Sequence, residues 1–176
     1  MFEELVKKRK SIRKFKENPI EKEKIEKLLE CARLSPSACN SQPYRFVVMS
    51  GEYKNKFCDS VFTGMFSACS FVKKAPVIIA IVRTKTSLKM KIGNMVCDTD
   101  FSLIDLGIAG EHMVLAATDM GLGSLWVGWF DKKKAFEFLN LKKGENIEII
   151  IAIGEKDEEP NERKKKSFED IVEFRS

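Results

Sequence analysis

Hydrophobic residues recur at helical spacing in several stretches of the chain. From Glu21 to Leu34 they follow the i, i+3, i+4, i+7 rule, and this pattern predicts an amphipathic helix that Ser35-Pro36 ends. From Asp98 to Met120 apolar residues lie on nearly every side, which predicts a core helix ended by Gly121. We expect further helices over shorter or less regular stretches, at Phe2–Lys10, Tyr53–Val72, Lys132–Leu139 and Ser167–Phe174.

Other stretches are predicted to be strands. Pro76 to Val82 is a continuous apolar run rich in β-branched residues, which is typical of a central strand buried on both faces. We expect the remaining strands at Tyr44–Met49, Leu125–Trp129 and Ile147–Gly154. Because helices and strands alternate unevenly, the pattern favours an α+β fold over a regular doubly wound one.

Length and composition are those of one folded domain, residues 1–176, because 44% hydrophobic residues and 13 phenylalanines exclude a disordered polymer. The longest apolar run, Ala75 to Val82, is far shorter than the roughly 20 residues of a membrane helix. We therefore expect no membrane partner, and Glu3 and Glu4 stand where a signal peptide would be positive. Five cysteines without a C-x-x-C pair speak against disulfides and zinc, and favour a cytoplasmic location.

The net charge of +5 is concentrated in two places. Residues 7–16 hold seven basic and no acidic side chains, and Arg163 to Lys166 adds four more, so that the rest of the chain is net acidic. A run of charge by itself is more often a solvated face or a loose nucleic-acid patch than a specific site. The concentration nevertheless makes these stretches candidates for binding an anion.

The side chains that usually carry catalysis are missing from the sequence. His112 is the single histidine, and no H-E-x-x-H, G-x-S-x-G, Walker A or G-x-G-x-x-G motif is found. Cys39 has no histidine nearby in sequence to activate it and is interpreted as a loop filler, while Trp126 and Trp129 are interpreted as packing residues. An enzyme with this sequence needs a borrowed reagent, and a flavin fits because the cofactor carries the reaction.

The basic stretch near the N-terminus is a candidate holder for such a cofactor. Arg9-Lys10-Ser11-Ile12-Arg13 combines guanidiniums, an ammonium and a hydroxyl, which match phosphate oxygens. If the backbone is extended there, residues 9, 11 and 13 share one side. The alternative interpretation is that these side chains only cap and solvate the first helix.

At four ordered places the sequence resembles the FMN-dependent nitroreductase family. Arg9 to Phe15 (RKSIRKF) is similar to its opening R-R-S-x-R-x-F, and Leu34 to Phe46 (LSPSACNSQPYRF) is similar to its A-P-S-x-x-N-x-Q-P-W-x-F signature. Asp105 to Gly128 resembles its helix and G-L-G-S-x-W-x-G turn, and Ile153 to Val172 its closing strand, basic pair and terminal helix. Together these matches cover nearly the whole chain.

The resemblance implies a nitroreductase-like fold, with a mainly antiparallel sheet flanked by helices, in an intertwined homodimer with FMN at the interface. It places the phosphate and ribityl end of FMN against Arg9, Lys10, Ser11 and Arg13. From the other end of the chain the phosphate is reached by Arg163 and Lys165, or by Lys164 or Lys166 if the register is shifted by one. The partner subunit lines the flavin with Pro36, Ser37, Ala38, Asn40 and Gln42, the last of which either contacts the flavin or braces the loop. The backbone along the ring is that of Val127, Gly128 and Trp129, and an N–H there donates to N5.

The implied function is hydride transfer from NAD(P)H onto FMN and then electron transfer to a small acceptor, a nitroaromatic or a quinone, in ping-pong order. The alternatives are a flavin-binding protein without turnover and a basic nucleic-acid-binding module, although an exposed aromatic ladder is lacking and we expect no nucleic-acid partner. The sequence also departs from the family pattern. Tyr44 replaces a frequent Trp, residues 57–70 lack a clear Asn for the pyrimidine edge, and residues 92–98 leave little room for a lid.

Overall fold

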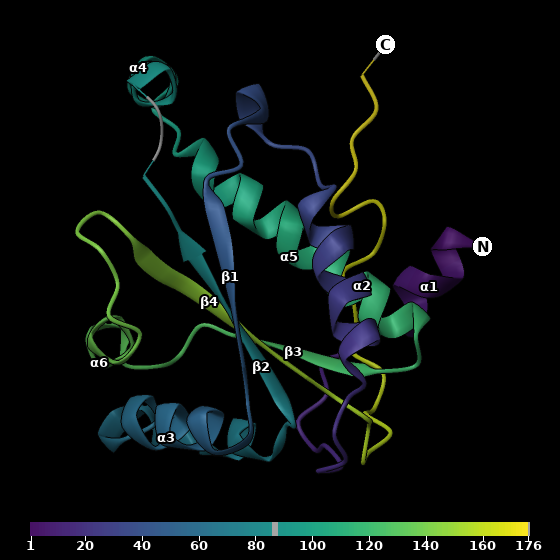
Figure 1. Cartoon of the computed structure of the whole chain (residues 1–176). Coiled ribbons are helices and arrows are strands. Elements are labelled where there is room, and N and C mark those ends of the chain that lie inside the picture. The colour runs from purple at the N-terminus through teal and green to yellow at the C-terminus, as the bar shows by residue number, and fades with distance from the viewer. Residues whose placement is uncertain (86–87, 176) are drawn as a thin grey trace.

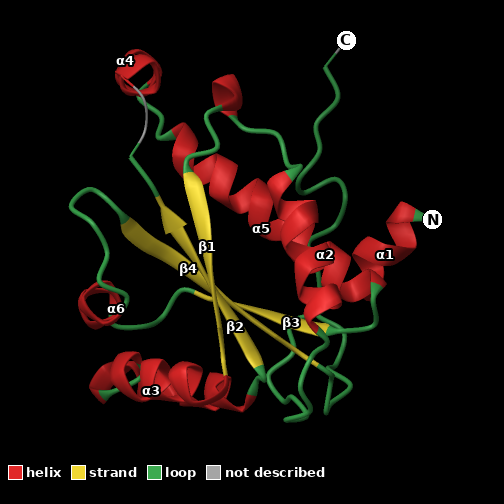
Figure 2. Cartoon of the chain, viewed as in Figure 1, coloured by secondary structure: helices red, strands yellow, loops and turns green. Residues whose placement is uncertain are grey.

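The polypeptide forms an antiparallel sheet with helices on both of its faces (Figures 1 and 2). The structure is a computed structural model that describes residues 1–85 and 88–175. Its strands are β1 (Tyr44–Ser50), β2 (Val77–Arg83), β3 (Gly123–Val127) and β4 (Asn146–Gly154). Its helices are α1 (Phe2–Lys8), α2 (Lys22–Arg33), α3 (Gly51–Val61), α4 (Leu88–Cys97), α5 (Phe101–Asp119) and α6 (Lys132–Phe138), with 3-10 stretches η1 (Ala38–Asn40) and η2 (Gly64–Lys74).

The strand order is β1-β2-β4-β3, and every neighbouring pair is antiparallel. The inner strand β2 is buried along nearly its whole length, and its side chains alternate between two cores. Ile78 and Ala80 belong to the core on the α3 and α6 side, while Ile79 and Ile81 belong to the core on the α2 and α5 side. The predictions of a central, doubly buried strand, of an α+β fold and of an antiparallel sheet are therefore confirmed.

The long helix α5 lies across one face of the sheet beside α2 (Figure 1). Its length and composition alone would permit it to cross a membrane, but it packs against α2, β2 and β3, as a core helix does. Leu106 and Met113 are buried in this packing, whereas Leu103 and Ile104 are 47% and 49% exposed. The prediction of a core helix is thus confirmed by this packing, although no described part of the chain covers its first turns at Leu103 and Ile104.

Other expectations from the sequence are also corrected. Tyr53–Val72 is not one helix, because the backbone breaks before Gly64, whose φ is +55°. The predicted strand Leu125–Trp129 starts two residues earlier, at Gly123, where it pairs with Gly154. Residues 92–98, which were expected to leave little room for a lid, belong largely to α4. Residues 167–174 form turns rather than a helix, and Phe168 and Phe174 remain exposed because no described part of the chain covers an apolar helix face there.

One glycine determines how closely α5 approaches the sheet. A Cβ built on Gly110 would lie 2.3 Å from the Cη2 atom of Trp126, the fourth residue of β3. No real Cβ contact is that short, so only glycine at this position lets the indole ring fill the space between helix and strand. Trp126 packs against the core on the α5 side, and its interpretation as a packing residue is confirmed.

Replacing a glycine inside a helix by alanine usually stabilises the helix, but the contact of Gly110 with Trp126 predicts a loss of stability. Gly110→Ala should lower the free energy of unfolding by about 1–2 kcal/mol, because overpacking costs about 1–3 kcal/mol and the helix propensity of alanine returns at most about 1 kcal/mol. Denaturant unfolding measures the change, and the loss should shrink in a Trp126→Leu background. Equal or higher stability of Gly110→Ala would contradict the contact.

Candidate functional site

The N-terminal segment, residues 9–16, leaves α1 and runs along the free edge of β3. Ser11 forms a parallel bridge with Ser124, and the Ile12 amide donates to the Ser124 carbonyl at 3.0 Å. Ile12 is almost fully buried, and a Cβ on Gly123 would lie 2.9 Å from its Cγ1 atom. Glycine at position 123 therefore allows the segment to lie directly against the strand, in the extended conformation that the sequence predicted.

The side chains of this segment point to different places. The Arg9 Nε atom lies 3.8 Å from Glu111 Oε1 on α5. Arg13 is close to the thiol of Cys69 in η2. Burial raises the pKa of this thiol above its usual value, and the charge of Arg13 offsets part of that rise. Lys10 instead donates to the carbonyl of Pro160 at 3.2 Å and lines, together with buried Ile12, a cavity of about 410 Å³. Lys10 is thus separated from Arg9 and Arg13, although the four polar residues were predicted to act together.

The chain beyond β4 returns along the N-terminal segment. We call residues 155–160 the return segment. The Lys16 amide donates to the Glu155 carbonyl and the Asp157 amide donates to the Lys14 carbonyl, both at 3.0 Å. The two segments therefore run antiparallel, side by side beneath β3 in Figure 1.

This pairing brings the two basic stretches of the sequence to the same region. Lys10 contacts Pro160, and Arg163 and Lys165 follow Pro160 by three and five residues. Since an extended chain spans at most about 3.6 Å per residue, the Cα atom of Arg163 lies within about 11 Å of that of Pro160. Both side chains are exposed, so they are free to contact an anion beside the N-terminal segment.

The loop formed by residues 36–42 is shaped by its own polar groups. The Ser37 hydroxyl accepts from the Gln42 amide at 3.0 Å, and the Gln42 side-chain amide donates to Asn40 Oδ1 at 3.2 Å. Cys39, Asn40 and Gln42 all have positive φ angles, close to +50°. In this structure Gln42 braces the loop, which is one of the two roles that the sequence left open, and Pro36 and Asn40 are exposed.

A buried carboxylate that the sequence analysis did not single out anchors this loop. The Ala38 amide donates to Asp105 Oδ1 at 2.9 Å, and Asp105 is only 3% exposed. Its second oxygen, Oδ2, is buried and has no hydrogen-bond partner in the described structure. The sequence offered one signal for this anchor, an acidic residue within the most apolar helix. A charge is retained in such surroundings only with a polar partner.

Within one chain loop 36–42 lies far from the cavity beside Lys10. The loop is anchored at Asp105, near the start of α5, whereas the cavity beside Lys10 is lined by Thr118 and Asp119 at its end. Thirteen residues of helix at 1.5 Å each separate these points by about 20 Å. The loop is closer to Arg9, because Glu111, which Arg9 contacts, is only six residues of helix, about 9 Å, from Asp105.

The backbone from Val127 to Trp129 follows directly on β3. Val127 is buried, whereas Gly128 and Trp129 are exposed, so the peptide groups between them face an open surface. Trp129 is held by its indole N–H, which donates to the Met65 carbonyl at 3.0 Å, and by its contact with the ring of Phe66. Four residues at about 3.3 Å place Gly128 roughly 13 Å along the strand from Ser124, where the N-terminal segment pairs.

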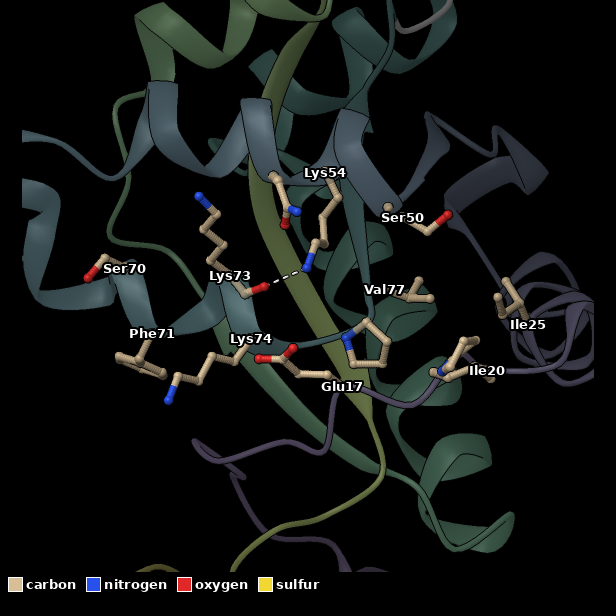
Figure 3. A pocket seen from close by; sticks show the side chains of 14 residues that line it. Glu17, Ile20, Ile25, Ser50, Lys54, Ser70, Phe71, Lys73, Lys74 and Val77 are labelled. Carbon is tan, nitrogen blue, oxygen red and sulfur yellow. Dashed lines mark hydrogen bonds between the residues drawn. The ribbon is translucent and has the colours of Figure 1, made fainter.

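A larger cavity, of about 810 Å³, lies between α3, η2 and the chain before α2 (Figure 3). It is lined by residues that the sequence analysis did not assign to a site. Lys54 is buried at the wall of this cavity and donates to the carbonyls of Lys73 and Ala75, the latter at 2.7 Å. Burial lowers the pKa of Lys54. Burial also raises the pKa of the nearby Cys58 thiol, to about 11. Lys73 is paired with Asp59 at 2.6 Å. These cations are already partnered, so Lys54 joins η2 to α3 rather than offering an anion site.

Two further side chains, His112 and Cys39, lie in surroundings that indicate structural roles. His112 is exposed on α5, with its Nδ1 atom 2.9 Å from the Ile108 carbonyl, as expected for a histidine without catalytic partners. Cys39 is exposed at a positive φ of 52°, in a tight turn of loop 36–42.

Comparisons with known proteins agree on one family. The model described as "Nitroreductase family" matches residues 6–155. A Methanothermobacter thermautotrophicus protein, provisionally named NADH dehydrogenase/NAD(P)H nitroreductase, is 34% identical over 125 residues, which cover 71% of this chain and 59% of that protein. An FMN-dependent nitroreductase from Clostridium difficile R20291 is 30% identical, with a TM-score of 0.72 over 97% of this chain and 96% of that one. A nitroreductase family protein from Streptococcus pneumoniae TIGR4 is 26% identical, with a TM-score of 0.83 over 99% of this chain and 100% of that one.

The anchoring of loop 36–42 predicts different effects for two substitutions of Asp105. Asp105→Ala should lower the free energy of unfolding by about 1–2 kcal/mol and speed hydrogen exchange at the Ala38 amide, because that amide loses its acceptor. Asp105→Asn keeps an acceptor oxygen and should preserve most of the protection. Denaturant unfolding and amide hydrogen exchange measure both effects, and unchanged protection in Asp105→Ala would contradict the anchor.

Proposed function

The chain belongs to the nitroreductase family of FMN-dependent NAD(P)H oxidoreductases, and from this premise we propose that it binds FMN at the interface of a homodimer and reduces a small electron-poor acceptor, a nitroaromatic or a quinone. The observation that carries the proposal is the convergence of two basic stretches, from opposite ends of the chain, beside β3. FMN, when bound, supplies the hydride chemistry at its N5 atom, between NAD(P)H and the acceptor in ping-pong order. The chain itself has to bind the phosphate and orient the ring.

The N-terminal segment supplies donors that fit a phosphate. Lys10 and Ile12 line a cavity that Arg9, Ser11 and Arg13 do not line, and Arg9 lies near Glu111 while Arg13 lies near Cys69. Guanidiniums pair with phosphate oxygens through two N–H groups, and the hydroxyl adds one neutral hydrogen bond. Arg163 and Lys165 complete this set from the return side, while Lys10 contributes from the opposite face through its contact with Pro160.

The end of β3 supplies the surface for the ring. Val127, Gly128 and Trp129 lie about 13 Å along the strand from the phosphate donors, so one mononucleotide can contact both places. The backbone N–H of Gly128 or Trp129, both exposed residues, would donate to the N5 position of a bound flavin and would stabilise negative charge there. A backbone donor of this kind explains how the chain works without a catalytic side chain.

The position of loop 36–42 supports a site shared between two subunits. Along α5 the anchor of the loop at Asp105 lies about 20 Å from the cavity beside Lys10 and about 9 Å from Glu111, which Arg9 contacts. In the proposed dimer Pro36, Ser37, Ala38 and Asn40 line the flavin that the partner subunit holds. Exposed apolar residues lie at the same end of α5, namely Leu103 and Ile104 on α5 and Ile92, Met95 and Val96 on α4. Burying this surface against a second copy stabilises the dimer and positions the loop.

The surroundings of the basic stretches favour a small anion over a nucleic acid. Glu111 and Glu155 contact the N-terminal segment, and Glu158 accepts from the Lys14 amide. The open positive surface is therefore smaller than the run of lysines and arginines indicates. All five cysteines are free thiols, which supports a cytoplasmic location.

The first test is cofactor binding and turnover. The purified protein should be yellow, bind FMN, and oxidise NAD(P)H in the presence of menadione or a nitrofuran. Arg13→Ala should weaken FMN binding by about 10- to 100-fold, as expected for the loss of a charged hydrogen bond, while Lys14→Ala, the same charge change at the next position, should have little effect. A colourless protein that takes up no FMN would refute the proposal, and flavin binding without turnover would leave a flavin carrier.

A second test uses mixed dimers. Arg13→Ala damages the phosphate end of a site and Ser37→Trp damages the loop that the partner supplies, so each homodimer should bind FMN poorly. In a mixed dimer one site carries both changes and the other carries neither. Coexpression at equal amounts should therefore restore FMN to about a quarter of all sites under random pairing. If no flavin binding returns, each site is built by a single chain.

A further inference from the structure

The return segment is acidic, although the segment that it follows is basic. Between Glu155 and Pro160 it carries four acidic side chains and one lysine, and it lies antiparallel to residues 10–16 through the backbone contacts described above. Such complementary charge stabilises the pairing. One of these carboxylates makes contacts that the others do not.

Glu158 binds the backbone of the predicted phosphate site. Its Oε1 atom accepts from the amide of Arg13 and, at 3.1 Å, from the amide of Lys14. These two donors belong to consecutive residues, so one carboxylate oxygen fixes the chain direction at Arg13. Glu159, the next residue, is exposed and pairs only with Lys156, at 3.5 Å, among the described residues.

Lys10 fixes the far end of the same return segment. Its ammonium donates to the Pro160 carbonyl at 3.2 Å, two residues beyond Glu158. Together the two contacts hold the chain at Glu158 and at Pro160, and the basic run begins only three residues later. The reach of Arg163 toward the N-terminal segment is therefore set by where these contacts place Pro160.

A carboxylate close to a phosphate site needs a structural reason, because two negative charges repel each other. The two amide contacts of Glu158 supply that reason, since they hold its charge against the backbone. Among the described residues, the only other polar side-chain contact between the return segment and this end of the N-terminal segment is the ion pair of Glu155 with Lys16, at 3.9 Å. The contacts of Glu158 are therefore the ones that hold the return segment at Arg13 itself.

We propose that Glu158 and Lys10 are positioning residues for phosphate recognition, which hold the return segment in the register that delivers Arg163 and Lys165 to the cofactor. This inference rests on the proposed FMN function. It assigns Lys10 a contact with the chain in place of a contact with the phosphate, and it gives Glu158 a role despite its unfavourable charge.

The experiment compares two flavins that differ only in the phosphate. FMN and riboflavin are titrated into the full chain after its flavin has been removed, and binding is followed by quenching of flavin fluorescence. Glu158→Ala should weaken FMN binding about tenfold and leave riboflavin binding unchanged, because the lost contribution acts on the phosphate. Glu158→Gln keeps an acceptor oxygen for the two amides and should recover most of the affinity.

Matched variants separate positioning from charge. Glu159→Ala makes the same charge change one residue later and should bind FMN as the wild type does. Lys10→Met should weaken FMN binding, whereas Lys14→Met, the same change on an exposed side chain, should not. In a chain that also carries Arg163→Ala and Lys165→Ala, Glu158→Ala should cause no further loss, because the residues that it positions are already gone.

The outcomes are distinguishable. If Glu158→Ala binds FMN as tightly as the wild type or more tightly, or if FMN and riboflavin binding weaken equally, the inference is wrong while the proposed function stands. Losses that add to those of Arg163→Ala and Lys165→Ala also overturn it. If the wild-type chain binds no FMN, the proposed function fails, and the inference fails with it.

Discussion

The candidate site depends on one contact, the pairing of the N-terminal segment with β3 and with the chain that leaves β4. Ile12 is buried against Gly123, and its amide is bonded to Ser124, so the segment is fixed to the sheet edge. Because the return segment is bonded to the same stretch, residues 155–160 are held beside the N-terminal segment in a chain of 176 residues. The second basic stretch therefore begins three residues after Pro160, which Lys10 contacts, although more than 140 residues separate the two stretches in sequence.

The same architecture divides the site. Along α5 the cavity beside Lys10 lies near one end and loop 36–42 near the other, where the buried carboxylate of Asp105 holds the loop. An isolated subunit therefore presents two incomplete halves together with exposed apolar residues on α4 and α5. In the proposed dimer, a second copy related by twofold symmetry would cover the apolar surface and join each half to its complement.

Cofactor chemistry explains why no catalytic side chain stands out. A flavin carries the reactive atoms, so the chain has to supply only charge for the phosphate and a backbone donor for the ring. Both requirements are met by main-chain geometry and common basic residues. Burial shifts the pKa values of Lys54 and Cys58, but Lys54 lies beside a cavity where its hydrogen-bond partners are backbone carbonyls.

The sequence by itself determined the elements whose surroundings are uniform along the chain. The apolar run of β2 indicated a central strand, and the ordered motifs indicated the family, because both signals lie in neighbouring residues. Tertiary structure decided everything that depends on what lies opposite a residue. Helix α4 and the exposed face of α5 follow from which surfaces the chain leaves uncovered, and the terminal segment stays non-helical because no described part of the chain covers its apolar residues. Only the fold revealed that Lys10 faces Pro160 and that Asp105 and Glu158 bind distant amides, since hydrogen bonds across 67 and 144 residues leave no periodic pattern in the sequence.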